Sequence, residues 1–128
     1  MILQNKVSDL TMAYGLAKAF RLPFPKIKID TDLDKTLGCN LAIWKKDLLA
    51  LNGFDEAYEG WGREDSDLVA RLYHLGLKRK LVHGRAIVFH LDHPLNSKAQ
   101  LDKNNARLER VLQEKAIRCE RGISTNPH

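Results

Sequence analysis

Apolar residues recur at intervals of three and four positions in several stretches of the chain, and this spacing places them on one side of a helix. The clearest stretch predicts a helix over residues 64–75. Gly76 closes it, because glycine readily adopts the left-handed conformation that ends many helices. A second helix is predicted over residues 9–20, where Ser8 supplies a favourable first cap.

A further helix is predicted near the C-terminus, opening at Asn96 or Ser97 and running to about Glu120. Its apolar stripe is thin, and the adjacent Asn104 and Asn105 weaken it. The stripe does not keep the regular repeat of a coiled coil. We therefore expect this helix to dock on the body of the protein or on a partner.

Four short stretches have the composition of strands, and they span residues 26–30, 41–44, 77–82 and 85–90. The apolar run at 41–44 is typical of a buried strand. It leads into a short helix over residues 46–51, which Gly53 closes after Asn52. Short strands among flanking helices indicate an α/β fold.

The chain has 128 residues, of which 44% are apolar and 29% are charged, and this composition fits one globular domain. No apolar run approaches the roughly 20 residues of a membrane span. The first residues also lack the apolar centre of a signal peptide. We therefore expect a cytoplasmic protein, or a piece of one, that can lie at the inner face of the membrane.

The formal net charge is +5. Basic residues are scattered, and no aromatic residues interleave with them to make a stacking surface for bases. We therefore exclude nucleic acid as a partner and attribute the charge to a solvated surface, or to weak peripheral association with an anionic membrane. Cys39 and Cys119 lie far apart and lack metal-ligand spacing, so both are expected to be free thiols.

Three carboxylates, two glycines and a tryptophan occur within residues 60–67, at the start of the clearest helix. Acidic side chains are favourable there, because the free N–H groups of a helix start carry partial positive charge. A capped helix with a solvated acidic first turn would explain the acids alone. Trp61 between Gly60 and Gly62 favours a binding role, because an aromatic ring on a flexible turn offers a ligand a flat platform.

Other segments share this density of small, polar and aromatic residues, and they read GCN at 38–40, NGFDE at 52–56 and FHLDHP at 89–94. With GWGREDSDL between the last two, these motifs resemble the C-terminal half of inverting family 2 glycosyltransferases with the GT-A fold. The likeness is closest to the galactosyltransferase-type C-terminal segment and to bacterial enzymes that build lipopolysaccharide or capsule. It covers about residues 37–94, between a helix and linker at 1–36 and a helix and tail at 95–128.

This resemblance implies a fold and a reaction. The fold would be the C-terminal portion of a GT-A, Rossmann-like nucleotide-diphospho-sugar transferase, with the nucleotide-binding half missing. The reaction would move a sugar, galactose or an N-acetylhexosamine, from a nucleotide-sugar donor to a glycan acceptor hydroxyl with inversion. A hydroxyl is a poor nucleophile, so one carboxylate must take its proton as it attacks. The transition state resembles the oxocarbenium ion of glycoside hydrolysis.

The resemblance assigns Asp65 as the catalytic base and Glu64 as a sugar-binding acid beside it. Neighbouring helical residues point about 100° apart, so the two acids can serve different ligands. Asp67 stands four residues before Arg71, and an ion pair within the helix is the role we expect for it. Trp61 would line the sugar pocket, with an apolar lid or core role as its alternative.

Four more substrate-binding residues follow from the resemblance, namely Gly62, Arg63, Gly38 and Asn40. Arg63 could meet a phosphate, although a surface arginine is an equal alternative. Gly38 and Asn40 match the family's donor-side turn, and their alternative role is to lead into a strand.

The family places one metal-binding histidine near residue 90, and His90 is our match, with His93 as the second choice. A neutral imidazole is a good ligand for a transition metal. The complete enzyme would use a divalent metal, Mn²⁺ or Mg²⁺, to neutralise the diphosphate leaving group. Without the resemblance, both histidines would be assigned structural roles.

The GT-A fold also carries a DxD motif in its nucleotide-binding half. Asp30-Thr31-Asp32 has that spelling, but it lies close before Gly38 and follows no long apolar strand, so we interpret it as a turn. We therefore expect a fragment with negligible transfer activity, without dependable metal binding of its own. We also expect self-association through the apolar face that a missing half would cover.

Two functions from other classes compete with this hypothesis. The first is a non-catalytic module that holds a glycan or a partner protein with the same fold. It predicts that loss of the Asp65 carboxylate leaves sugar transfer intact. The second is a small metal-dependent hydrolase that uses His90 and His93. It would need a third metal ligand at suitable spacing, and the sequence offers no compelling one.

Overall fold

The computed structural model describes residues 27–33, 36–82, 88, 94 and 96–125. The helix predicted over 9–20 lies outside these residues, and so does the strand predicted over 85–90, apart from residue 88. The described elements form a small α/β structure of few short strands and helices, as the sequence pattern predicts.

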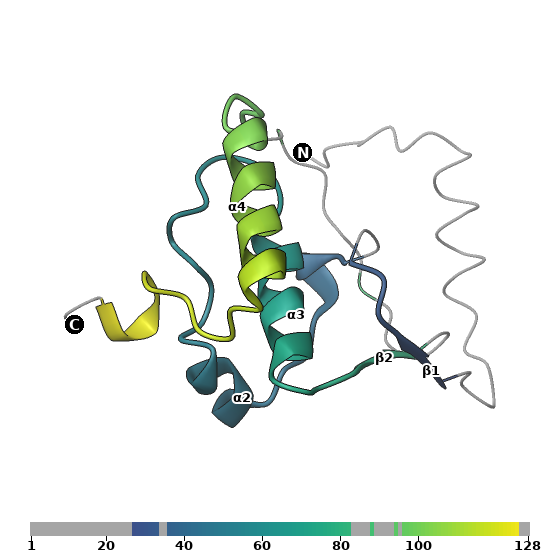
Figure 1. The fold of residues 1–128 in the computed structure, drawn as a ribbon. Coiled ribbons are helices and arrows are strands. Elements are labelled where there is room, and N and C mark those ends of the chain that lie inside the picture. The colour runs from purple at the N-terminus through teal and green to yellow at the C-terminus, as the bar shows by residue number, and fades with distance from the viewer. Residues whose placement is uncertain (1–26, 34–35, 83–87, 89–93, 95, 126–128) are drawn as a thin grey trace, which may run out of the picture.

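Two helices make the centre of the fold, and Figure 1 shows α4 (Leu101–Glu114) lying against α3 (Glu64–His74). The short helix α2 (Lys45–Ala50) lies near one end of α3. A two-stranded sheet of β1 (Ile27–Asp30) and β2 (Arg79–Val82) lies to one side.

Two single-turn 3₁₀ helices complete the described elements. They are η1 (Gly38–Asn40), before α2, and η2 (Ile123–Thr125), in the tail. Within the described residues, no helix combines the length and apolar character needed to cross a membrane.

The strands predicted over 26–30 and 77–82 are confirmed as β1 and β2, with the second starting two residues later. They pair antiparallel, and the register sets Asp30 opposite Arg79. Arg79 donates to a carboxylate oxygen of Asp30 at 3.1 Å and to the Thr36 hydroxyl at 2.7 Å. This one guanidinium therefore ties the end of the sheet to the chain that leads into η1.

The buried residues of α3 form the core of the fold. Leu68, Val69 and Ala70 are fully buried. Ala70 packs with Leu108 and Val111 of α4 in one apolar cluster. The helix predicted over 64–75 is therefore confirmed, with its apolar side inward, and it holds α4 against the fold.

Helices α2 and α3 end in the same way. After α3, Gly76 has φ +87°, and its N–H donates to Tyr73 O at 2.9 Å, as predicted for a glycine cap. After α2, Asn52 takes the left-handed position with φ +65°, and Gly53 follows with φ +75°. The predicted cap at Gly53 is thus displaced by one residue, because asparagine also tolerates this conformation.

The prediction of a buried strand over residues 41–44 is wrong. The backbone at Leu41 and Trp44 is extended, but no other described strand pairs with this segment. Trp44 is 77% exposed and serves as the N-cap residue of α2. A four-residue apolar run has the composition of a strand, but composition cannot supply the neighbouring strand that a sheet requires.

The C-terminal helix is shorter than the sequence pattern predicts, since α4 begins at Leu101 and ends at Glu114. Ser97 does not open it, because its hydroxyl instead accepts the Ala99 N–H at 3.2 Å in a local turn. At the other end, Lys115 takes the left-handed conformation with φ +51°. The docking of this helix on the body is confirmed by its packing on α3.

The tail after α4 pairs with the end of α2. Cys119 N–H donates to Leu51 O at 3.2 Å, and the Asn52 side chain donates to Cys119 O at 3.1 Å. Gly122 is required here, because a Cβ at this position would lie 1.9 Å from Asn52 O. Both thiols are free, as predicted, and burial raises the pKa of Cys119.

Candidate active site

The loop that precedes α3 has an unusual backbone. Three of its four residues have positive φ, namely Gly60 at 74°, Gly62 at 104° and Arg63 at 79°. The two glycines adopt this conformation without steric cost, whereas an arginine there costs about 1–2 kcal/mol. Such strain is often found at functional sites, and here it lies at Arg63, the N-cap residue of α3.

Helix α4 and the residues just before it hold this loop in place. Trp61 N–H donates to Ser97 O at 3.1 Å, and a Cβ on Gly60 would lie 2.7 Å from the same oxygen. The buried side chain of Asn104 donates to Glu59 O and to Gly62 O, both at 3.0 Å. The glycine at 60 is therefore needed for close approach as well as for its φ.

Asp65, the predicted base, joins the motif to the segment at residues 38–40. One carboxylate oxygen accepts the Gly38 N–H at 2.9 Å, across 27 residues of sequence. The other oxygen accepts the Ser66 N–H at 2.7 Å. A Cβ on Gly38 would lie 3.2 Å from the Asp65 Cβ, so glycine allows this approach. The structure therefore brings together Asp65 and Gly38, two of the residues that the sequence assigns to the site.

The three acids of the motif have separate surroundings. Glu64 is the first residue of α3, and like Asp65 it is half-buried at the edge of the fold. Asp67 is fully buried and accepts two bonds from Arg71, at 2.6 and 2.9 Å. Burial raises the pKa of Asp67, while Arg71 opposes the shift. The predicted ion pair within the helix is confirmed.

Arg71 gives this ion pair a wider role, because its guanidinium also donates to Leu51 O at 2.8 Å and Gly53 O at 3.0 Å. These carbonyls belong to the turn after α2. A single buried side chain therefore fixes α3 to that turn.

Trp61 is 40% exposed on the strained loop, so part of its ring is available to a ligand. The Lys98 ammonium lies 4.6 Å from the ring centroid, which is within the range of a cation–π contact. An aromatic face and a cation are thus presented together at this surface.

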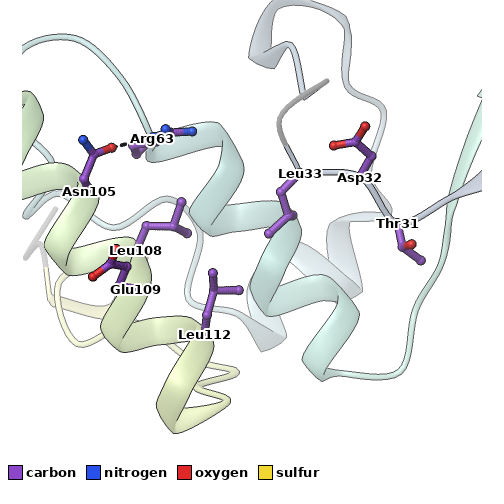
Figure 2. Close-up of a pocket in the computed structure, with 8 residues that line it drawn as sticks. All are labelled: Thr31, Asp32, Leu33, Arg63, Asn105, Leu108, Glu109 and Leu112. Atoms are coloured by element: carbon purple, nitrogen blue, oxygen red, sulfur yellow. Dashed lines mark hydrogen bonds between the residues drawn. The ribbon is translucent and has the colours of Figure 1, made fainter.

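Arg63 is bound to a side chain of α4. Its Nε donates to Asn105 Oδ1 at 2.7 Å, and Figure 2 shows the pair at the edge of a cavity of about 650 Å³. The other lining residues are Thr31, Asp32, Leu33, Leu108, Glu109 and Leu112. Neither Asp65 nor Trp61 lines this cavity.

The sequence Asp30-Thr31-Asp32 behaves as a turn here, as predicted. Asp30 accepts the Asp32 N–H at 3.2 Å. This bond lowers the pKa of Asp30, and the contact with Arg79 lowers it further. The carboxylate of Asp30 is thus used by the turn and by β2.

The proposed metal ligands His90 and His93 lie outside the described residues. In the part of the chain that is described, no three side chains of the metal-binding types gather closely enough to hold an ion. The assignment of either histidine to a metal stays a prediction.

Sequence reasoning missed the residues in and just before α4 that support the motif loop. Ser97 and Asn104 hold its backbone, and Asn105 holds Arg63. The one signal was the adjacent pair of asparagines in a helix, which the sequence analysis took as a weakness of that helix. Asparagine is costly within a helix, so its presence there can indicate a bond made to a neighbouring segment.

Comparison with known proteins relates the sequence of this chain to a family. Residues 18–94 match the family described as the N-terminal domain of galactosyltransferase. Chondroitin sulfate synthase 3 of Homo sapiens is 36% identical over 66 residues, which are 52% of this chain and 7% of that protein. The Mus musculus protein of the same name gives the same figures.

Beta-1,4-galactosyltransferase 1 of Mus musculus is 50% identical over 36 residues, which are 28% of this chain and 9% of that protein. The chain thus spans less than a tenth of the length of these relatives. No solved structure matches it. Its placement in the C-terminal half of a larger enzyme stays a prediction. Because the matched residues make up more than half of the chain and include the loop, Asp65 and Gly38, the chain belongs to this galactosyltransferase family of glycosyltransferases.

Proposed function

We propose that this chain carries the catalytic-base and acceptor side of a sugar transfer with inversion at the anomeric carbon. The donor would be a nucleotide-sugar, carrying galactose or an N-acetylhexosamine, and the acceptor a glycan hydroxyl. The contact between Asp65 and the Gly38 N–H is the observation that carries this proposal, because it joins two distant motifs at one carboxylate.

The geometry of Asp65 suits the role of a base. Gly38 and Ser66 hold its two oxygens, so the carboxylate has a fixed direction. A carboxylate oxygen has two lone pairs, and a backbone N–H uses one of them. The remaining lone pairs can accept the proton of an attacking hydroxyl while the backbone keeps the group in position.

The neighbouring residues take supporting roles in this proposal. Glu64 would accept a hydrogen bond from a sugar hydroxyl, and Trp61 would pack its exposed ring against a sugar face. Gly38 and Asn40 would lie on the donor side, with Gly62 shaping the loop between. Arg63 lines a separate cavity, and it would contact a phosphate only if the donor extends into that cavity.

A divalent cation, Mn²⁺ or Mg²⁺, would neutralise the diphosphate leaving group when bound. The imidazoles of His90 and His93 have the donor chemistry for such an ion, Mn²⁺ in particular, and one of them would hold it. No step attributed to Asp65 depends on the metal. We further propose that the reaction serves cell-surface polysaccharide synthesis, such as lipopolysaccharide, at the cytoplasmic face of a membrane.

The test is the substitution Asp65→Asn in the full-length gene product, assayed with a panel of nucleotide-sugars and glycan acceptors. We expect the transfer rate to fall at least about 100-fold, because the amide cannot take a proton. Circular dichroism and the melting temperature should be unchanged, because the amide oxygen can still accept from Gly38.

Asp102→Asn is the matched control, since Asp102 is an exposed acid in the first turn of α4. It should leave the transfer rate unchanged. If Asp65→Asn kept the full rate in a correctly folded protein, the chain would instead be a non-catalytic glycan- or partner-binding module.

A further inference from the structure

A second, smaller hollow is lined in part by Asn104. It has a volume of about 170 Å³ and is formed by the loop at 57–59, by α4 and by the tail. Its polar lining residues are Glu59, Gln100, Lys103, Asn104, Arg107 and Arg121. None of them belongs to the sugar-transfer site proposed above.

The charge of this hollow is unbalanced. Lys103, Arg107 and Arg121 face it with a single carboxylate, that of Glu59. Among the described residues, none of the three cations makes a salt bridge. Lys103 and Arg107 stand four positions apart on α4, where like charges destabilise a helix by a few tenths of a kcal/mol. This pair of like charges therefore lowers the stability of α4 slightly, so a contribution to stability does not explain why both cations are present.

Arg107 lines the hollow and lies against an aromatic ring. Its guanidinium carbon lies 5.6 Å from the centroid of the Tyr58 ring, so the aromatic face supports the planar group. Its Nε is buried and has no hydrogen-bond partner among the described residues. A buried N–H without an acceptor is costly, so the position of Arg107 is not the one that favours folding most.

We propose that this hollow binds a tetrahedral oxyanion, the phosphate or sulfate group of a ligand. Liquid water occupies about 30 Å³ per molecule, so the hollow has room for about five waters or for one such group with part of its hydration. Arginine and lysine are the side chains that bind these oxyanions most strongly. Glu59 is exposed at the rim, and the three cations outweigh it.

The hollow also borders the catalytic motif. Asn104 lines it and donates to Glu59 O, just before the motif loop, and to Gly62 O within that loop. A bound oxyanion would therefore touch the element that orients Trp61. The binding itself does not depend on sugar transfer, so a failed transfer assay would leave this proposal standing.

The experiment titrates the isotopically labelled protein at low ionic strength with inorganic phosphate, with sulfate and with vesicles of phosphatidylglycerol in phosphatidylcholine. Low salt is needed because salt screens exposed charges. We expect saturable binding of one phosphate or sulfate. The largest amide shifts should fall at residues 57–59 and 103–107, and little change should occur at residues 45–50.

The double substitution Lys103→Gln with Arg121→Gln should weaken this binding about tenfold or more, because it removes two charge-assisted contacts. It keeps Arg107 and its contact with Tyr58, so the fold should survive. Lys46→Gln with Arg110→Gln is the matched control, since both residues are exposed, neither lines the hollow, and the loss of net charge is equal. The control should bind within twofold of the wild type.

The vesicle arm identifies the source of the oxyanion. If vesicles bind and only the Lys103→Gln with Arg121→Gln substitution abolishes that binding, the oxyanion is a lipid phosphate. If soluble anions bind saturably and vesicles do not bind, it is a free or glycan-borne group. Equal weakening by both pairs would show general charge attraction and overturn the proposal. The proposal would also be overturned if phosphate and sulfate showed no saturable binding and neither double substitution changed vesicle binding.

Discussion

Asp65 and Asp67 are two residues apart, yet the fold gives them opposite surroundings. Residues at this spacing point about 200° apart around a helix. Asp65 lies at the edge of the fold and binds the Gly38 backbone, while Asp67 lies inside and binds Arg71. Substitution of either acid removes one carboxylate, but the consequences should differ in kind.

Asp67→Asn should destabilise the protein by about 3 kcal/mol, because it leaves the Arg71 charge buried without its counter-charge. The two carbonyls that also bind Arg71 keep the loss near the lower end of the usual range. Urea unfolding at neutral pH measures the change. Glu120→Gln, an exposed acid in the tail, should change stability by less than about 0.5 kcal/mol. Equal stability of Asp67→Asn and wild type would contradict the importance we give to this ion pair.

Gly38→Ala should reduce sugar transfer about tenfold with little loss of stability. The added Cβ would lie 3.2 Å from the Asp65 Cβ, so the carboxylate must move by a few tenths of an ångström. Small displacements of a catalytic group are costly for rate. The measurement is the transfer rate at saturating substrate, alongside the melting temperature.

Gly76→Ala is the matched comparison. Nothing lies within 4 Å of a Cβ there, but the residue has φ +87°. This substitution should cost about 1 kcal/mol of stability, because alanine disfavours the left-handed conformation, and it should leave the rate unchanged. The reverse pattern, with Gly38→Ala harmless to activity, would argue against Asp65 as the base.

At the scale of elements, the motif loop depends on α4 for its shape. Arg63 is strained at φ +79°, and a short loop does not keep a strained residue without support from its surroundings. Asn104 provides two of the supporting bonds from one buried amide. The motif loop is therefore only one half of a unit whose other half lies some 40 residues later in the sequence.

Asn104→Ala should destabilise the protein by about 2 kcal/mol, because the buried amide is lost and two part-buried carbonyls lose their donor. It should also loosen the loop, and Trp61 fluorescence in a Trp44→Phe background would report this as a shift toward the emission of a solvated indole. Gln113→Ala, an exposed change on the same helix, should alter neither property. Unchanged Trp61 emission in Asn104→Ala would mean that the loop holds its shape without this amide.

At the scale of the whole molecule, Asp30 and Arg79 join the two-stranded sheet to the segment that leads into the site. The pKa of Asp30 is lowered from 3.8 by the Asp32 N–H and by Arg79. A lowered pKa in the folded state means that the unfolded chain binds the proton more readily. This contribution to stability is therefore present above pH 3.8 and is lost as the pH falls toward the folded-state pKa.

The measurement is the free energy of unfolding of wild type and Asp30→Asn between pH 7 and pH 3. The wild type should be more stable at neutral pH, and the difference should shrink as the pH falls below about 4. Asp67 titrates in both proteins, so its contribution cancels in the difference. A gap that stayed constant over this range would rule out a charge contribution from Asp30.

Much of the local structure could be predicted from the sequence. Helix α3, its glycine cap, helix α2 and both described strands lie within two residues of their predicted positions at nearly every boundary. These elements carry strong local signals, namely helical periodicity, strand alternation and left-handed caps. The prediction of a strand at 41–44 was wrong because a strand needs a partner to pair with. The predicted C-terminal helix was too long because the ends of α4 depend on where the neighbouring chain turns away.

The candidate site could be predicted only in part. The motif identified Asp65 and Trp61, and the resemblance paired them with Gly38, which the structure places 2.9 Å from the Asp65 carboxylate. The supports at Ser97 and Asn104 could not be predicted, since a hydrogen bond to a distant carbonyl leaves no periodic trace in the sequence.

The sequence by itself therefore determined that the chain belongs to a glycosyltransferase family and where its main elements lie, because periodicity and motif order are properties of the chain. Only the tertiary structure decided that the Gly38 N–H binds Asp65, which segment supports the loop and where three cations gather. Those outcomes depend on contacts between residues tens of positions apart, such as Gly38 with Asp65 and Asn104 with Gly62. Such contacts form only when α3, α4 and the tail pack together and exclude water from between them.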